Sequence, residues 1–489
     1  MELKSKILLG MAGLGAMSIS PKNLPAQNLP TNSKPNVVLI FVDDMGYGDL
    51  SCYGATQYKT PNLDGMAANG ARFTNFYAAQ AVCSASRAAI LTGCYPNRIG
   101  IHGAFFPGSK TGLNPDEEII PELLKKRGYR SEAIGKWHLG DAQKFLPLQQ
   151  GFDEFLGLPY SNDMWPVNYD GTPVTQENHQ RPGNYPPLPL IRGNKTIREI
   201  RNLDDMGQLT TLYTEEAVKF IRKNKDHPFF LYLAHSMPHV PIAVSDKFKG
   251  KSKQGLYGDV VMELDWSVGQ ILKTLEENNL SSNTLVIFTS DNGPWINFGN
   301  HAGSTGALRE GKGTSFEGGQ REPCIMKWPG VIPAGIVCNE MACTIDILPT
   351  LAQITGSPLP EKKIDGVNIL PLMKGIPNAN PRKFLYYYYQ KNSLEAVREG
   401  SWKLVFPHQH RSYEGVLPGK DGYPGKTVNR ETGLALYDMR RDPGERYDVQ
   451  TLYPDTVQEL EKVAEQARED LGDDLTGAPG KNRRPPGHL

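Results

Sequence analysis

The sequence predicts an α/β fold built around a mostly parallel sheet. Three runs of β-branched and other apolar residues, 37–42, 229–234 and 284–289, have the pattern of strands buried on both faces. The second and third runs each follow an amphipathic segment with helical spacing, over 214–224 and 260–278. Buried strands that alternate with helices favour a parallel sheet, in which ligands bind where the strands end at their carboxyl edge.

The character of the chain changes after Pro371. Runs at 384–389, 396–406 and 434–438 have the composition of antiparallel strands joined by turns, and an amphipathic helix is expected over 454–471. This pattern predicts a smaller C-terminal α+β domain with an antiparallel sheet.

The first residues have the features of a secretory signal peptide. Two lysines precede a short apolar run over 7–20, and four prolines follow between Pro21 and Pro35. The run is too short to cross a membrane as a mature helix. The sequence therefore predicts an exported protein, periplasmic or extracellular, without a membrane span.

These features divide the chain into four parts. They are a signal peptide and linker (1–27), an N-terminal domain (35–375), a C-terminal α+β subdomain (376–475) and a charged, Pro-rich tail expected to be disordered (476–489).

The charges of the chain are balanced, with 53 Lys and Arg residues and 53 Asp and Glu residues. Without a global positive field, nucleic acid is not an expected partner, and any anionic ligand must be held locally. Six cysteines in 489 residues are too few for a disulfide scaffold, and their pairing cannot be read from the sequence.

Polar side chains follow two of the predicted strands directly. Asp43 and Asp44 come after the first run, and Asp291 and Asn292 come after the third. Each pair alone has an alternative role as a turn former or helix cap. Because parallel strands end at one edge of a sheet, the two pairs can converge, and several oxygen ligands favour a hard cation such as calcium.

The segment V-C-S-A-S-R-A-A-I-L-T-G, residues 82–93, is the most informative in the chain. Residues 84–92 are expected to form a short helix that ends at Gly93, which puts Cys83 at its positive end and Arg87 over the same face. A negatively charged group would be favoured there. An isolated cysteine is more often a small buried hydrophobe, so the function of Cys83 depends on the whole motif.

C-S-A-S-R followed by A-A-I-L-T-G resembles the signature of the formylglycine-dependent type I sulfatases, in particular the arylsulfatase A-like branch of the alkaline-phosphatase superfamily. The resemblance implies an alkaline-phosphatase-like large mixed sheet flanked by helices, with a catalytic N-terminal domain that hydrolyses sulfate esters. It also implies that a maturation enzyme converts Cys83 to formylglycine. One hydroxyl of the hydrated aldehyde would attack sulfur, and the other would later expel sulfate.

Other segments match the same family in order. G-K-W-H-L-G supplies Lys136 and His138, whose spacing projects them to the same side of a strand. H-S-M-P-H-V-P supplies His239 as the active-site histidine, while His235 is expected to have a supporting or structural role. Standing alone, each would be interpreted as a core histidine or a solvated lysine.

Two further positions complete the match. Lys312, in the glycine-rich run 306–323, falls where the family has a sulfate-binding lysine. Ser161, in the segment 151–163, falls where the family has a serine that contacts the substrate. The resemblance runs from about Pro35 to about Pro371.

The resemblance also implies a role for each residue. The implied metal ligands are Asp43, Asp44, Asp291, Asn292 and modified Cys83; the implied catalytic residues are Cys83, Arg87, Lys136, His138, His239, Asp291 and Lys312; the implied substrate contacts are Lys136, Ser161, His239 and Lys312. Asp291 would act as base on the attacking hydroxyl, and His239, with Lys312, would protonate the leaving alcohol. His138 would assist the release of sulfate.

The sequence leaves two alternatives open. A phosphatase or a phosphodiester or phosphonate hydrolase of the same superfamily would share the fold, although most of these enzymes use Ser or Thr nucleophiles and His-rich zinc sites. A non-catalytic protein that binds sulfated glycans would leave Cys83 unmodified.

The expected substrate is an aryl sulfate or a sulfated carbohydrate, of the galactose or N-acetylgalactosamine type. No motif identifies the sugar. His179, His408 and His410 are polar candidates in the variable loops, and each is expected to be a solvated surface residue.

Overall fold

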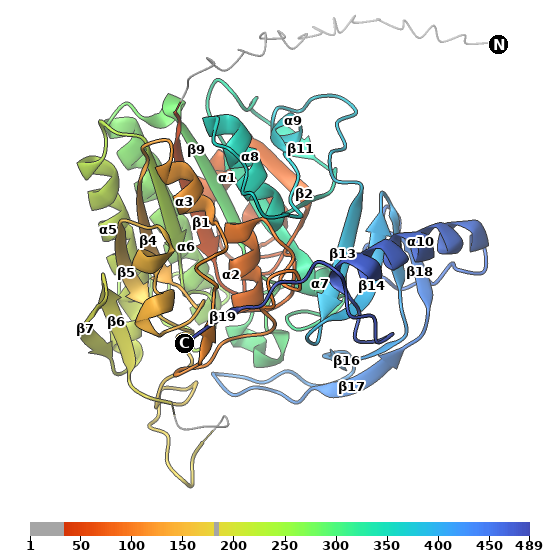
Figure 1. Ribbon diagram of the computed structural model, residues 1–489. Coiled ribbons are helices and arrows are strands. Elements are labelled where there is room, and N and C mark those ends of the chain that lie inside the picture. Colours follow the sequence, from red (N-terminus) through yellow and green to blue (C-terminus); the bar gives the residue numbers. More distant parts are fainter. Residues whose placement is uncertain (1–33, 180–184) are drawn as a thin grey trace, which may run out of the picture.

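A large central sheet with helices on both faces forms most of the protein, and a smaller unit packs beside it (Figure 1). The computed structural model describes residues 34–179 and 185–489. The central sheet has eleven strands in the order β11-β2-β10-β9-β1-β8-β4-β5-β6-β7, with β12 also paired to β2. Its strands are β1 (Asn36–Val42), β2 (Ala71–Tyr77), β4 (Arg130–Lys136), β5 (Glu154–Leu158), β6 (Leu188–Arg192), β7 (Lys195–Ile200), β8 (Phe229–Ala234), β9 (Thr284–Ser290), β10 (Arg321–Lys327), β11 (Ile336–Cys338) and β12 (Ala342–Cys343). The predicted α/β fold is confirmed.

The three predicted buried strands lie together at the centre of the sheet. They are β1, β8 and β9, and β1 pairs in parallel with both of the others. Every residue of the three strands is buried, as their continuous apolar sequences predict. Antiparallel pairs occur toward the edges, where β10 pairs with β9 and β6 pairs with β5. The central strands therefore share one carboxyl edge.

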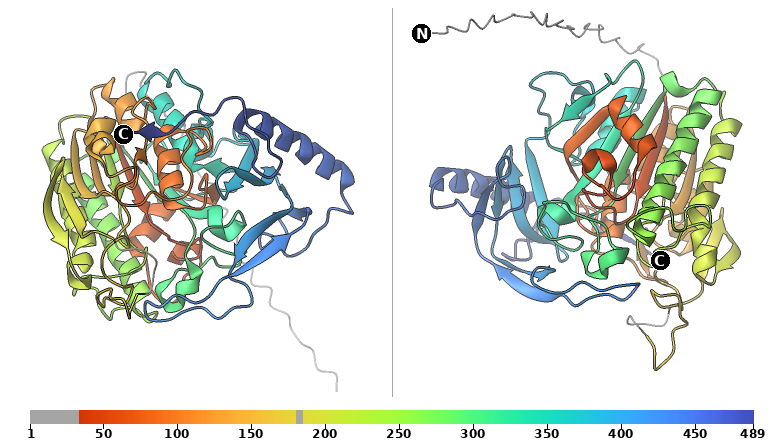
Figure 2. Two further views of the ribbon diagram at one scale, coloured as in Figure 1. Left: turned by 60° about the horizontal axis from the view of Figure 1, so that its bottom comes forward. Right: turned by 180° about the vertical axis from the view of Figure 1, so that it is seen from behind.

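Helices cover the two faces of the sheet in separate groups, one seen from the front in Figure 1 and the other from behind in the right view of Figure 2. Alternate residues of β1 point to opposite faces. Val38 belongs to the core shared with α1, α5 and α6, whereas Leu39 belongs to the core shared with α2, α3 and α8. The α-helices are α1 (Pro61–Ala68), α2 (Cys83–Thr92), α3 (Ile120–Lys125), α4 (Leu203–Gly207), α5 (Leu209–Lys223), α6 (Leu256–Glu277), α7 (Glu317–Gln320), α8 (Ile347–Thr355), α9 (Leu370–Met373) and α10 (Pro454–Leu471).

The C-terminal domain contains a second, antiparallel sheet. Its order is β13-β14-β15-β18, with bounds β13 (Phe384–Tyr389), β14 (Ser393–Glu399), β15 (Trp402–Val405) and β18 (Ala435–Asp438), and α10 packs across it. A separate hairpin consists of β16 (His408–Ser412) and β17 (Val428–Thr432). The run 396–406 contains the end of β14 and all of β15, which pair antiparallel across a turn at Gly400, whose φ is 53°.

The tail differs from its predicted disorder. Residues 487–488 form β19 (Gly487–His488), which pairs with β3 (Thr111–Gly112) of the N-terminal domain. Arg484 donates from Nε and Nη2 to the two oxygens of Glu117, at 2.7 and 2.8 Å. The composition of the tail gives no sign of these distant partners, which order it.

Two predictions concern membranes and export. The predicted signal peptide, 1–27, lies outside the described residues. Within 34–179 and 185–489, we find no helix with the length and apolar character needed to cross a membrane.

The contact of the tail with Glu117 can be tested by mutation. Arg484→Ala removes the bidentate partner of the buried Glu117 carboxylate, so we expect a loss of about 1–3 kcal/mol in the free energy of unfolding. Lys481→Ala is the matched control, because its pair with Glu469 is exposed and should contribute little to the free energy of unfolding. Denaturant unfolding measures both variants, and equal effects would contradict an ordered, stabilising tail.

Candidate active site

The predicted site residues converge at the carboxyl edge of the central strands. Asp43 and Asp44 follow β1, and Asp291 and Asn292 follow β9. The amide N–H of Asp44 donates to Asp291 Oδ1 at 3.1 Å, and Asn292 Nδ2 donates to Asp44 Oδ1 at 2.6 Å. The parallel pairing of β1 with β9 brings the two pairs side by side, as the sequence predicts.

Two side-chain oxygens among these four residues accept no hydrogen bond from the described part of the chain. Oδ1 of Asp43 and Oδ1 of Asn292 are buried and have no hydrogen-bond partner among the described residues. Burying polar atoms without partners is costly, so these two oxygens are available to a ligand of the site. Asp44 has a left-handed backbone, with φ of 60°, and this uncommon conformation turns its carboxylate into the site. The oxygens present suit a hard cation.

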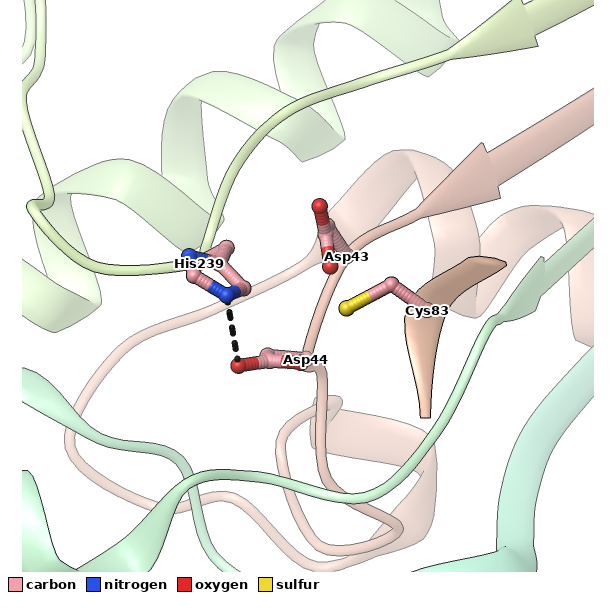
Figure 3. Close-up of side chains that lie close together, drawn as sticks. All are labelled: Asp43, Asp44, Cys83 and His239. Carbon is pink, nitrogen blue, oxygen red and sulfur yellow. Dashed lines mark ion pairs between the residues drawn. The ribbon is translucent and has the colours of Figure 1, made fainter. Parts of the chain in front are cut away.

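Cys83 faces these carboxylates. It is the first residue of α2, and the side chains of Asp43, Asp44, Cys83 and His239 offer ligand atoms within 4.8 Å of one another (Figure 3). Lys312 Nζ lies 3.3 Å from its sulfur. Burial raises the pKa of the Cys83 thiol to about 11, against the opposing effect of Lys136 and Lys312. The unmodified residue is therefore a neutral thiol at neutral pH, and a poor nucleophile.

Two cations pair with the carboxylates of Asp43 and Asp291. Arg87 Nη2 lies 2.8 Å from Asp291 Oδ2 and 3.3 Å from Asp43 Oδ2, and Lys136 Nζ donates to Asp43. Burial would raise the pKa of the Asp43 carboxyl, but Lys136 and Arg87 outweigh it and hold that pKa well below its usual range. Burial and the neighbouring Asp43 raise the pKa of Asp291.

Lys312 and Ser161 also lie in the site. Lys312 Nζ donates to both oxygens of Asp44, at 2.7 and 2.9 Å. Lys136 Nζ donates to Ser161 Oγ at 3.0 Å, which holds the serine hydroxyl beside this lysine. Both lysines are buried, and each has a carboxylate partner.

His239 points its Nε2 atom toward the carboxylates. This atom lies 3.6 Å from Asp44 Oδ2 (Figure 3). Nδ1 donates to the carbonyl of Val240 and so carries the proton of the neutral ring. Burial lowers the pKa of His239, and the nearby Lys312 lowers it further. The ring is therefore neutral at neutral pH and presents an acceptor to the site.

The geometry of His138 differs from the prediction. β4 ends at Lys136, and His138 lies beyond it with a left-handed φ of 59°, so the two residues do not share one face of a strand. His138 Nε2 bonds to the carbonyl of Phe105 at 2.8 Å, and burial and Lys136 lower its pKa. It still lies close to the charges of Asp43 and Arg87.

The remaining histidines are less involved. His235 is buried and bonds to Ser267 Oγ at 3.1 Å, consistent with a structural role. His179 is exposed as expected, whereas His408 and His410 are buried on the β16-β17 hairpin, where each bonds to a backbone carbonyl. The expectation that His408 and His410 are surface residues was wrong, because their alternate positions on β16 face Phe316.

One residue beside the site was missed. Trp295 is half-buried, its ring centroid lies 5.9 Å from that of His239, and Lys312 Nζ lies 5.1 Å from its ring. It follows Asn292 by three positions, and nothing in its sequence context marks it as different from an ordinary core tryptophan.

Comparisons with known proteins identify the family. The family model described as Sulfatase matches residues 35–357, and the model described as C-terminal region of aryl-sulfatase matches residues 380–482. Arylsulfatase A of Homo sapiens is 38% identical over 451 residues, which cover 90% of this chain and 88% of that protein. N-acetylgalactosamine-6-sulfatase of Canis lupus familiaris is 39% identical over 495 residues, which cover 95% of this chain and 89% of that protein.

Solved structures agree in fold. The PsFucS1 sulfatase from Pseudoalteromonas sp. is 28% identical with a TM-score of 0.79, and the alignment covers 92% of each chain. A phosphonate monoester hydrolase of Agrobacterium radiobacter, 18% identical with a TM-score of 0.59 over 89% of this chain and 95% of that one, shares the fold alone. With nine-tenths of its length matched by named sulfatases, the chain belongs to the sulfatase family and is a sulfuric ester hydrolase.

Proposed function

We propose that the protein is an exported, calcium-dependent sulfatase that removes sulfate from a sugar and uses Cys83, converted to formylglycine by a maturation enzyme, as its nucleophile. The observation that carries this proposal is the position of Cys83. Cys83 is the first residue of α2. Its side chain lies among those of Asp43, Asp44, His239 and Lys312 instead of in apolar packing. A neutral thiol there has no evident use, whereas a hydrated aldehyde supplies a hydroxyl nucleophile and a second hydroxyl through which the aldehyde can be regenerated.

The metal ligands we propose are Asp43, Asp44, Asp291 and Asn292, with an oxygen at position 83. The unpartnered Oδ1 atoms of Asp43 and Asn292 support this set. Calcium prefers six to eight oxygen ligands, so we assign the nitrogen of His239 to the substrate instead. The ion would supply positive charge against the oxygens of the sulfate ester.

The cationic side chains would bind and orient the sulfate group. Lys136, Lys312 and Ser161 present donors to one small region, and Arg87 holds the carboxylates of Asp43 and Asp291 in place. This arrangement supports electrostatic stabilisation of charge that develops on the sulfate oxygens.

Proton transfers are assigned to three groups. Asp291, whose pKa is raised, would accept the proton of the attacking hydroxyl. His239 would carry a proton at Nε2 to the leaving oxygen, assisted by Lys312, because an anionic ester favours the charged imidazolium. His138 would assist regeneration of the aldehyde.

A sugar substrate is supported by Trp295. Its half-buried ring adjoins both His239 and Lys312, and aromatic rings in binding sites commonly pack against apolar faces of ligands. Relatives of this chain include proteins named N-acetylgalactosamine-6-sulfatase, and a solved relative was crystallised with a neocarrahexaose. We therefore propose sulfated galactose or N-acetylgalactosamine units as substrates, met in the periplasm or outside the cell.

The nucleophile can be tested directly. Cys83→Ala should reduce release of sulfate from an aryl sulfate to background, while the unfolding midpoint stays within a few degrees. Cys338→Ala, a buried cysteine on β11, is the matched control and should stay active. Mass spectrometry of the wild-type peptide should detect the aldehyde, and an unmodified, dispensable Cys83 would exclude this mechanism.

The metal can be tested by removal. Incubation with a calcium chelator should abolish activity, and calcium should restore it better than magnesium or zinc, which prefer other geometries. Loss of even an outer partner of a metal ligand typically costs about 10–100-fold in metal affinity, so Asn292→Ala should weaken calcium binding at least that much. Calorimetric titration of the chelated protein measures this affinity, and undiminished calcium binding by the variant would argue against the proposed ligand set.

The sugar contact predicts a selective effect. Trp295→Ala should lower kcat/KM for sulfated N-acetylgalactosamine by about tenfold, or about 1.4 kcal/mol, mainly through KM, while Trp295→Phe keeps most of it. Trp266→Ala removes a half-buried tryptophan on the outer side of α6 and should have no effect. Equal kinetics for the Ala and Phe variants at position 295 would rule out stacking.

A further inference from the structure

We propose that the C-terminal domain positions Lys312, and that Tyr413 is the positioning residue through which it acts. This inference rests on the sulfate-binding role proposed above for Lys312. It assigns to a residue outside the matched catalytic motifs a measurable part in turnover.

Both main-chain polar groups of Lys312 are held. Its N–H donates to the carbonyl of Pro294 in the N-terminal domain at 3.0 Å. Its carbonyl accepts from the hydroxyl of Tyr413, in the C-terminal domain, at 2.6 Å. Lys312 Nζ meanwhile reaches Asp44 and Cys83. Contacts from both domains therefore hold the main chain of Lys312 while its side chain enters the site.

Lys312 lies in a loop, residues 310–316, that leads into α7. The start of this loop is also held by the C-terminal domain. The carboxylate of Glu310 accepts from Ser412 Oγ at 2.5 Å and from the N–H of Tyr413 at 2.8 Å. Glu310 and Tyr413 are both buried, so solvent does not weaken these bonds. Residues 412–413 therefore contact the loop at two places, Glu310 and Lys312.

The end of the loop is fixed by buried charges. Lys403, whose side chain has no exposed surface, donates to the carbonyl of Ser315 at 2.9 Å and lies 3.2 Å from Glu317 and 2.7 Å from Glu445. The N–H of Glu317 donates to Glu445 Oε2 at 2.8 Å. Lys403 and Glu445 come from the C-terminal domain, and Ser315 and Glu317 come from the loop and α7.

The loop needs external support because of its own sequence. Lys312 lies between Gly311 and Gly313, and Gly313 has a left-handed φ of 80°. Glycine adds backbone freedom, so the loop alone does not specify where the lysine side chain starts. A small displacement of a binding group can cost a large factor in rate, so the contacts from Tyr413 affect turnover through Lys312.

Tyr413→Phe tests this inference because it removes one hydroxyl and leaves the ring. We expect kcat/KM for an aryl sulfate to fall by about threefold to tenfold, and the Kd of inorganic sulfate to rise by a similar factor, the range that one hydrogen bond supports. Tyr388→Phe is the matched control, since its buried hydroxyl also donates to backbone carbonyls of the C-terminal domain but contacts no part of the loop. It should leave both values unchanged.

A double-mutant cycle with Lys312→Ala separates positioning from a general structural effect. If Tyr413 acts through Lys312, Tyr413→Phe should have no further effect on either value in the Lys312→Ala protein. The same loss in both backgrounds would overturn the inference and leave the proposed function intact. Wild-type activity and sulfate binding in Lys312→Ala alone would instead overturn the proposed role of Lys312, and the inference with it.

Discussion

The balance of buried charge at the carboxyl edge of the sheet is the constraint on which the rest of the site depends. Asp43, Asp44 and Asp291 are buried, and Arg87, Lys136 and Lys312 supply three matching cations. Removing a partner from a buried pair is costly, so each group holds the others in position. A divalent cation would give this neutral set a net positive charge, which suits an anionic ester in a chain whose overall charge is zero.

The sheet produces this arrangement through strand order. β1 lies between β8 and β9, so the residues after these three strands emerge at one edge. There the N–H of Asp44 donates to Asp291, and the carboxylate of Asp44 accepts from Asn292 Nδ2. The helix that starts at Cys83 adds its positive end to the same edge.

The parts of the fold that the sequence predicts correctly are those set by residues close together in the chain. Buried strands, amphipathic helices and the polar residues directly after strands could be located because strand period and strand ends are visible in the sequence. The relation of His138 to Lys136 could not, because it depends on where β4 ends and the backbone turns. The order of the tail and the burial of His408 depend on partners hundreds of residues away or in another sheet, such as Glu117 for Arg484.

The contact between Tyr413 and Lys312 belongs to this last group, and it shows how the two domains are coupled. A buried network such as that of Lys403, Glu317 and Glu445 adds little net stability compared with apolar packing, but a shifted interface would leave a charge buried without its partner. The main effect of this network is therefore to fix the position of the C-terminal domain relative to the loop. Because Glu317 follows Lys312 by five residues, the network that sets the position of the C-terminal domain also sets the end of the loop that delivers the lysine to the site.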